Sequence, residues 1–267
     1  MHRDPIDTLE VLSAQPKGPA RPTPLLFVHG AYAAAWCWQE HFLGFFAEAG
    51  YASHAVSLSG HGGSRGRKHI DTFSITDYAK DLREIAKTLP EPPVLIGHSM
   101  GGFVVQKYLE RHAAPAAVLM CSVPPQGLIA SAVGLFFSKP TLMTDLNRIM
   151  GGGHASLDTL RDALFAQPVA VDDLQRYYRL TQRESHRAIW DMTLFNLPSP
   201  SRLKDTPLLV QGAELDHLIP ASLVEMTART YGVPANIFPG MGHGLMLERD
   251  WKKPAQQILD FLRERGV

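Results

Sequence analysis

The sequence contains little cysteine, with only Cys37 and Cys121 among its 267 residues. Two thiols without metal-ligand spacing argue against a disulfide framework and a zinc site, and we expect both to be small buried apolar side chains. No apolar run is long enough to span a bilayer, and the N-terminal residues lack the apolar core of a signal peptide. We therefore expect a cytoplasmic protein without stable membrane insertion.

An excess of charge of one sign is also absent. Lys plus Arg equals Asp plus Glu, at 26 each, and no long run of one sign occurs. This balance gives no sign of a basic surface for nucleic acid, and we expect no nucleic-acid partner. The 45% hydrophobic and 19% charged residues are ordinary for a globular enzyme, and the length allows one domain, with or without an insertion. The oligomeric state is left open.

Strand-like and helix-like segments alternate along most of the chain, which predicts an α/β fold with a mostly parallel sheet covered by helices on both faces. Apolar runs and period-two patterns predict strands, the first of them at an edge of the sheet, and amphipathic spacing predicts helices. The expected strands are 8–12, 25–28, 52–58, 93–96, 116–120, 207–210 and 236–238, and the expected helices are 36–49, 75–89, 102–109, 220–231 and 251–265.

The alternation stops between residues 124 and 204. This segment is rich in helix-forming residues and is interrupted by Pro140, by glycines 151–153, by Pro168 and by Pro198. We interpret it as a helical cap inserted over the carboxyl edge of the sheet, where open α/β sheets bind ligands. Residues 1–123 and 205–267 then form the core.

The most informative motif is the G-x-S-x-G stretch at residues 97–101. An apolar strand leads into Ser99 and a helical segment follows it. A sharp turn from strand to helix exposes the serine hydroxyl, and the flanking glycines avoid collisions with the neighbouring elements. The motif predicts a nucleophile elbow with Ser99 as the nucleophile.

A serine nucleophile needs a base and a third group that orients the base. His243 lies between glycines in the loop after the last predicted strand, and we expect it to be the base. Asp216 and Glu214 compete for the acid, because both follow the 207–210 strand. We favour Asp216, which lies deeper in its loop, whereas Glu214 is expected to cap or to form an ion pair.

An oxyanion hole needs two backbone N–H groups that point to the developing charge. Met100, directly after the nucleophile, is the first expected donor. The second is Ala31 in the loop after the 25–28 strand, where Gly30 lets the backbone turn towards the site. We expect His29 to form a hydrogen bond within this loop and His98 to pack beside the elbow.

These motifs resemble the α/β-hydrolase superfamily over nearly the whole chain. The resemblance rests on residues 28–31, on residues 59–64 with their Gly-His-Gly-Gly sequence, on the elbow, on Asp216 and on His243. Residues 28–38 are similar to the branch with plant methylesterases and hydroxynitrile lyases, and residues 60–62 to bacterial lysophospholipase-type and carboxylesterase members. The resemblance implies a cofactor-free enzyme with catalytic Ser99, His243 and Asp216.

The expected function is hydrolysis of a carboxylic ester with a small or medium apolar group. Tyr32 and Trp190 are candidate substrate-binding residues, and no metal site or organic cofactor is implied. The same triad allows three other reactions: C–C bond hydrolysis, perhydrolysis and hydroxynitrile cleavage. The last of these would use a cap lysine, for which Lys139 and Lys204 are the candidates. A ligand receptor with slow turnover is the alternative from another class.

Overall fold

The structure is a computed structural model that describes residues 8–129, 144–145, 148, 156–203 and 205–267. Its centre is a seven-stranded sheet with the strand order β1-β3-β2-β4-β5-β6-β7. β1 pairs with β3 in antiparallel orientation at one edge, and every other neighbouring pair is parallel. The strands are β1 (Val11–Ala14), β2 (Leu25–Val28), β3 (Ser53–Val56), β4 (Val94–His98), β5 (Ala117–Met120), β6 (Leu208–Ala213) and β7 (Ala235–Phe238).

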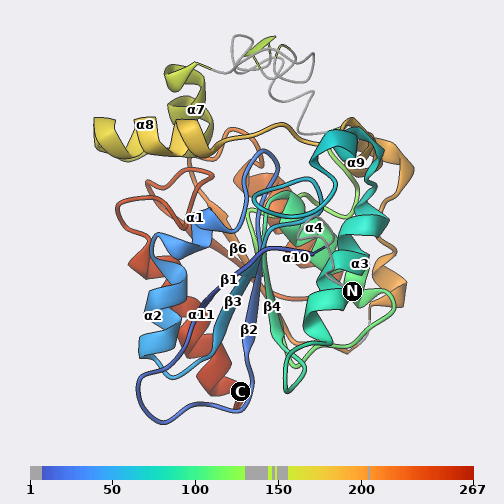
Figure 1. Ribbon diagram of the computed structural model, residues 1–267, viewed down its shortest axis with the longest axis vertical. Coiled ribbons are helices and arrows are strands. Elements are labelled where there is room, and N and C mark those ends of the chain that lie inside the picture. The colour runs from blue at the N-terminus through green and yellow to red at the C-terminus, as the bar shows by residue number, and fades with distance from the viewer. Residues whose placement is uncertain (1–7, 130–143, 146–147, 149–155, 204) are drawn as a thin grey trace, which may run out of the picture.

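Helices cover both faces of this sheet (Figure 1). One face carries α1 (Trp36–Gln39), α2 (Phe42–Glu48) and α11 (Lys252–Glu264), and the other carries α3 (Ile75–Ala86), α4 (Met100–Leu109) and α10 (Ala221–Tyr231). A 3₁₀ segment, η2 (Arg67–Thr72), precedes α3. The α/β-hydrolase fold predicted from the sequence is therefore confirmed.

The sheet separates two apolar cores. In β2, Leu25 and Phe27 pack into the cluster under α1, α2 and α11, whereas Leu26 and Val28 pack into the cluster under α3, α4 and α10. This division follows from the alternation of side chains along a strand, and it explains why β2 and β5, which are buried on both faces, are apolar at every position. All four β2 residues are fully buried.

The register aligns the carboxyl ends of the central strands. Val28 of β2 pairs with Gly97 of β4, and His98 pairs with Met120 of β5. The loops that follow β2, β4, β5, β6 and β7 therefore leave the same edge of the sheet, because these strands are parallel. Residues 29–33, Ser99, Asp216 and His243 all lie in these loops.

Two of the differences between predicted and observed elements have a clear cause in tertiary contacts. The single helix expected over 36–49 is divided into α1 and α2, because tertiary contacts hold the two intervening residues: Glu40 pairs with Arg176, and His41 leaves helical geometry and stacks on Trp251 at 4.6 Å. The strand expected over 8–12 begins only at Val11, since the Glu10 backbone N–H donates to the Ser64 hydroxyl at 2.8 Å.

Every described element within residues 124–204 is helical. These elements are α7 (Leu157–Leu164), α8 (Val171–Leu180), α9 (His186–Trp190), the π-helix η3 (Asp191–Phe195) and the 3₁₀ turn η4 (Pro200–Arg202). α7 and α8 lie above the upper end of the sheet in Figure 1. The division into core and cap remains a prediction. Lys139, Pro140, glycines 151–153 and Lys204 lie outside the described residues.

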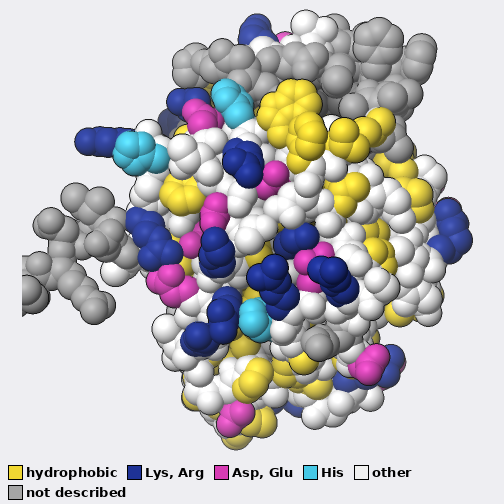
Figure 2. Space-filling view, turned by 90° about the vertical axis from the view of Figure 1, so that its right-hand side faces the viewer, with side chains coloured by type: hydrophobic (Ala, Val, Ile, Leu, Met, Phe, Trp, Pro, Cys, Tyr) yellow, Lys and Arg dark blue, Asp and Glu magenta, His cyan; other side chains and the backbone are white. Residues whose placement is uncertain are grey.

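Within the described ranges, no helix has the length and apolar character that a membrane span requires. Basic and acidic side chains are interspersed on the face shown in Figure 2. Among the described residues, Arg65 pairs with Asp81 and Glu84, and Lys80 pairs with Asp77.

Candidate active site

Ser99 occupies the turn between β4 and α4. Its backbone has φ 53° and ψ −118°, which L-residues rarely adopt. A Cβ on Gly97 or Gly101 would collide with backbone atoms: those of Gly101 for the first, and those of Val28 and His29 for the second. The two glycines of the motif therefore permit this close turn, and the serine is only half-buried while its neighbours are buried.

Asp216 and His243 come together as a buried pair. The Nδ1 atom of His243 lies 2.7 Å from Oδ2 of Asp216, and both side chains are almost fully enclosed. The other oxygen of Asp216 accepts the backbone N–H groups of Leu218 and Ile219, each at 2.8 Å. The acid is thus held by its own loop and oriented towards the imidazole. Nε2 of His243 makes no hydrogen bond within the described part of the chain.

His98 connects the serine turn to the loop of His243. Its Nε2–H donates to the backbone carbonyl of His243 at 2.9 Å, and the two rings lie 4.6 Å apart. Burial, and then the nearby His243, lower the pKa of His98 well below its usual value. His98 is therefore neutral, and its place beside the elbow agrees with the sequence prediction.

The loop of residues 29–33, called here the oxyanion loop, passes close to Ser99. A Cβ on Gly30 would lie 2.8 Å from Nδ1 of His98 and 3.1 Å from Cβ of Ser99. Among the described residues, the N–H groups of Ala31 and Met100 donate to no protein acceptor. Their role as oxyanion donors remains a prediction. Met100 is also the first residue of α4, where the helix dipole favours negative charge.

His29 stabilises the base of the oxyanion loop. Its Nδ1–H donates to the Gly30 carbonyl at 2.8 Å, as predicted, and its Nε2 accepts the Leu58 N–H at 3.1 Å. Burial, and then the charge of His61, lower the pKa of His29 to about 3. This imidazole is therefore neutral at physiological pH.

Backbone strain is concentrated around this site. Three described residues other than glycine have positive φ angles: Tyr32 (62°), Ser99 (53°) and Cys121 (42°). They belong to the oxyanion loop, to the serine turn and to the residue after β5. Such conformations persist only where surrounding contacts impose them, and they are common at functional sites.

Cys121 lies beside the acid. Its burial, and then Asp216, raise the pKa of this thiol well above its usual value. Cys121, Asp216 and His243 offer ligand atoms within 4.8 Å of one another. The set does not suit a metal ion, because the thiol is protonated and the carboxylate already accepts three hydrogen bonds. The sequence prediction for Cys121 named only a buried apolar side chain.

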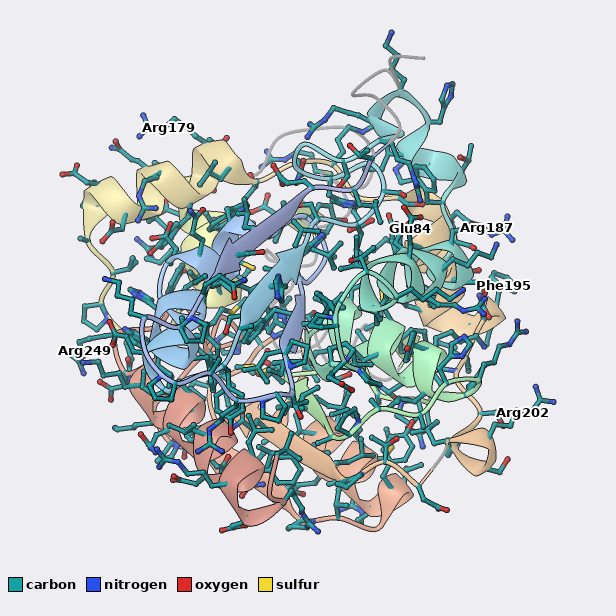
Figure 3. All side chains as sticks on the ribbon, turned by 60° about the horizontal axis from the view of Figure 1, so that its bottom comes forward. Glu84, Arg179, Arg187, Phe195, Arg202 and Arg249 are labelled. Atoms are coloured by element: carbon teal, nitrogen blue, oxygen red, sulfur yellow. The ribbon has the colours of Figure 1, made fainter. Side chains whose placement is uncertain are left out.

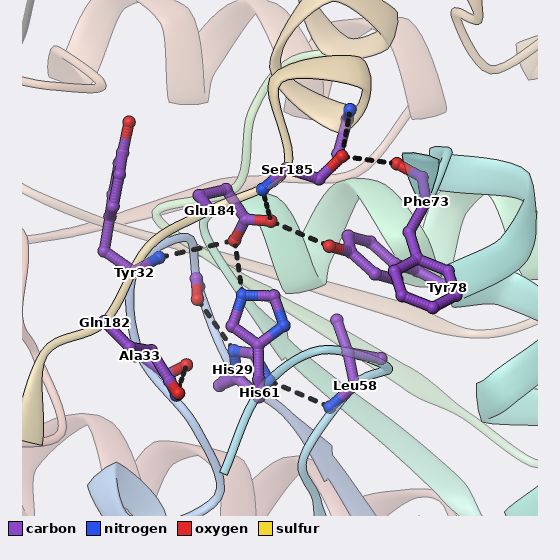
Figure 4. A network of polar contacts seen from close by, with 12 residues as sticks. His29, Tyr32, Ala33, Leu58, His61, Phe73, Tyr78, Gln182, Glu184 and Ser185 are labelled. Carbon is purple, nitrogen blue, oxygen red and sulfur yellow. Dashed lines mark hydrogen bonds and ion pairs between the residues drawn. The ribbon is translucent and has the colours of Figure 1, made fainter. Parts of the chain in front are cut away.

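The remaining candidates have the following positions. Glu214 is exposed and accepts the Gly240 N–H at 2.8 Å, which leaves Asp216 as the carboxylate on His243. Tyr32 is half-buried, and its ring points away from the polar network in Figure 4. Trp190 is 55% exposed and its ring lies 6.3 Å from Phe195, which points outward at the rim in Figure 3. No described contact brings Trp190 to Ser99, so its binding role remains a prediction.

Sequence reasoning missed Glu184, which lies in the segment between α8 and α9. Its side chain is fully buried and contacts His61, Tyr78 and the backbone of Tyr32 (Figure 4). A glutamate in a polar stretch has the appearance of a surface residue, and its partners are 106 to 152 positions away. The Gly-His-Gly loop that carries His61 was noted, but only as a feature of the resemblance.

A strained serine between strand and helix, followed along the chain by an acid and a histidine after later strands, is the arrangement of an α/β-hydrolase. The chain belongs to the alpha/beta hydrolase family, whose family model matches residues 25–256.

Curated relatives share sequence with parts of this chain, and solved structures share its fold. A non-heme chloroperoxidase from Burkholderia pyrrocinia is 34% identical over 40% of this chain and 40% of its own length. Methyl jasmonate esterase 1 from Vitis vinifera is 34% identical over 32% of this chain and 33% of its own length. The matched segments thus cover less than half of these curated relatives. An esterase from Exiguobacterium antarcticum shares the fold, with a TM-score of 0.72 and 19% identity over 96% of this chain and 95% of that chain.

Proposed function

We propose that this protein is a serine hydrolase that cleaves a carboxylic ester through an acyl-enzyme. The observation that carries the proposal is the buried 2.7 Å contact between Asp216 and His243, whose loop is joined through His98 to the turn of Ser99. The chain order of Ser99, Asp216 and His243 supports the proposal, because it is the order of serine, acid and histidine in this fold. The reaction needs no metal ion or organic cofactor.

Acylation begins when Oγ of Ser99 attacks the ester carbonyl and its proton moves to Nε2 of His243. Asp216 holds the imidazole by Nδ1 and stabilises the imidazolium that forms. The N–H groups of Ala31 and Met100 donate to the carbonyl oxygen, which carries the negative charge in the tetrahedral intermediate. The C–O bond to the alcohol then breaks, and His243 gives its proton to the leaving oxygen.

Deacylation repeats these steps with water as the nucleophile. His243 takes a proton from water, and the resulting hydroxide attacks the acyl carbonyl. The same oxyanion hole stabilises the second tetrahedral intermediate. When this intermediate collapses, the proton returns to Oγ of Ser99 and the carboxylic acid is released.

The proposed substrate is a small-molecule ester with a small or medium apolar group, turned over in the cytoplasm. The similarity to a methyl jasmonate esterase supports this class, because that name describes an ester with a small alcohol. The segment 124–204, the proposed cap, would shape the pocket together with Tyr32 and Trp190. Within the described part of this segment, the Leu164 carbonyl accepts the Gly244 N–H at 2.7 Å, which places the end of α7 against the His243 loop.

Perhydrolysis is the second candidate, and the similarity to a non-heme chloroperoxidase favours it. Hydrogen peroxide would replace water as the nucleophile on the same acyl-enzyme and release a peroxy acid, so no additional residue is required. Turnover of one ester with and without added peroxide distinguishes the two reactions by their products.

The test combines active-site labelling with turnover. We expect a fluorophosphonate to label Ser99, as located by mass mapping, and p-nitrophenyl esters to be hydrolysed with a preference for one acyl length. Ser99→Ala should remove the label and lower kcat by about 10⁶-fold, with circular dichroism unchanged. Ser122→Ala is the control, because Ser122 is buried, and its hydroxyl contacts only the Val123 carbonyl and the Gln106 amide among the described residues. Label on another serine, or full turnover by Ser99→Ala, contradicts the proposal.

A further inference from the structure

Residues 181–185, called here the cap linker, lie directly on the oxyanion loop. Glu184 in this linker is fully buried and uses both carboxylate oxygens (Figure 4). Oε2 contacts Nε2 of His61 at 3.0 Å and accepts the Tyr32 N–H at 3.3 Å. Oε1 accepts the Tyr78 hydroxyl at 2.8 Å and the Ser185 N–H at 2.7 Å. One side chain therefore joins the cap linker to three separate parts of the core.

The contact between Glu184 and His61 is an ion pair. Both ring nitrogens of His61 face acceptors, since Nδ1 lies 3.2 Å from the Ser59 carbonyl and Nε2 faces the carboxylate. A ring that donates from both nitrogens carries a positive charge. Burial opposes this charge, but Glu184 outweighs it and raises the pKa of His61. Burial likewise opposes the carboxylate, but the charge and hydrogen bond of His61 lower the pKa of Glu184.

Gln182 supports the same loop from the same linker. Its backbone N–H donates to the Tyr32 carbonyl at 3.0 Å, and its side-chain amide donates to the Ala33 carbonyl at 2.9 Å. Tyr32 is therefore held on both of its backbone polar groups by the linker, at the positive φ described above. Only surrounding contacts can maintain this conformation in a residue with a side chain.

The residue before Tyr32 is Ala31, whose N–H is one of the two candidate oxyanion donors. We propose that Glu184, charged and paired with His61, is a positioning residue that fixes the oxyanion loop, so that Ala31 points its N–H to the carbonyl bound at Ser99. This inference rests on the proposed function. Buried ion pairs add little net stability compared with an apolar pair. The pair of Glu184 and His61 acts here through geometry: four donors surround one carboxylate, and together they hold the oxyanion loop in a single conformation.

Asp191 provides a matched control. It is also a buried carboxylate in segment 124–204, and it accepts the Ile75 N–H at 3.0 Å and the Asn196 amide at 3.3 Å. It also pairs with Arg187 at 3.5 Å. These contacts fasten the segment to the first residue of α3, and none of them involves the oxyanion loop. A role limited to holding this segment would give Asp191→Asn and Glu184→Gln the same kinetic effect.

The experiment compares Glu184→Gln with Asp191→Asn in the full chain. For each variant, kcat and KM are measured with a p-nitrophenyl ester, together with the inhibition constant of a trifluoromethyl ketone, whose serine adduct carries the oxyanion. We expect Glu184→Gln to lower kcat by about 10- to 100-fold and to raise the inhibition constant of the ketone by the same factor, with KM little changed. Asp191→Asn should change neither quantity by more than about twofold. The proposal is overturned if kcat falls equally in both variants, or if Glu184→Gln changes KM and leaves kcat unchanged.

A second variant covers the case in which Glu184→Gln does not fold. The double variant His61→Leu/Glu184→Leu removes both charges and leaves no buried ion without a partner. We expect this variant to fold, to retain fluorophosphonate labelling at Ser99, and to show the same kcat loss and weaker ketone binding. Wild-type kcat in the double variant overturns the positioning role. Absence of label at Ser99 in the wild-type protein would instead contradict the proposed function.

Discussion

The described part of this protein contains two buried histidine–carboxylate pairs, which differ in what the imidazole does with its second nitrogen. His243 uses Nδ1 for Asp216, and within the described ranges its Nε2 makes no hydrogen bond. His61 uses Nε2 for Glu184 and Nδ1 for the Ser59 carbonyl. A general base must keep one nitrogen for its proton donor. The comparison therefore supports the proposals that His243 transfers the proton and that His61 carries a fixed charge.

The carboxylates differ as well. Asp216 receives its two backbone donors from residues two and three positions along its own loop. Glu184 accepts from Tyr32 and Tyr78, which are 152 and 106 positions away. A locally held carboxylate orients one ring, whereas a carboxylate with distant partners connects segments of the fold.

The largest expected difference between the pairs is kinetic. His243→Gln removes the proposed base and should lower kcat by about 10⁶-fold, as the loss of a triad histidine does elsewhere. His61→Gln leaves the triad intact and should lower kcat by no more than about 100-fold through the oxyanion loop. Steady-state kinetics of both variants on one ester measure the ratio. Similar losses in the two variants would remove the distinction.

The pH dependence of stability gives a smaller effect. The raised pKa of His61 contributes stability below its ordinary value of 6.5, and this contribution is lost as the pH rises through the folded pKa. The lowered pKa of Glu184 contributes stability above 4.5, and this contribution is lost as the pH falls through the folded pKa. Relative to His61→Leu/Glu184→Leu, the wild-type protein should therefore be most stable between these two pH values.

Urea unfolding of both proteins at about pH 5.5 and about pH 9 measures this effect, because only the wild-type protein retains the two titrating groups. The wild-type free energy of unfolding, minus that of the double variant, should be smaller at the higher pH. A difference that grows with pH would mean that His61 is neutral in the folded protein, and the ion pair would have to be abandoned.

The smallest effect belongs to a third pair of this kind. His186 lies 3.3 Å from Asp71, with 44% and 42% of the side chains exposed. Exposed pairs contribute little, so His186→Ala should lower the free energy of unfolding by no more than about 1 kcal/mol and leave kcat unchanged. Thermal unfolding and ester turnover check this expectation. If His186→Ala lowered kcat or stability as much as substitutions in the two buried pairs, burial would not explain the difference among the three histidine–carboxylate pairs.

The sequence predicted the parts of the site that short motifs specify. Ser99 is marked by glycines at both sides, and Asp216 and His243 follow strands that end at one edge of a parallel sheet. The fold class was predictable for a related reason, since apolar strands and amphipathic helices alternate. These signals are local, and the parallel sheet brings them together.

Glu184 was not predictable in this way, because its partners become neighbours only after folding. The division of the 36–49 helix has the same origin: Glu40 and His41 form contacts with Arg176 and Trp251 that the helical pattern does not contain. Helix propensity is weak compared with such tertiary contacts. Sequence periodicity therefore identifies elements better than it identifies the residues that interrupt or connect them.

The positive φ angles of Tyr32, Ser99 and Cys121 have a consequence for the evolution of this chain. Each such residue holds about 1–3 kcal/mol of backbone strain, which glycine would relieve. Selection for heat resistance alone would therefore favour glycine at these three positions. Glycine at Tyr32 or Cys121 would release loops beside the proposed nucleophile, and glycine at Ser99 would remove that nucleophile itself. Thermal tolerance gained at these positions would therefore be accompanied by slower or no turnover.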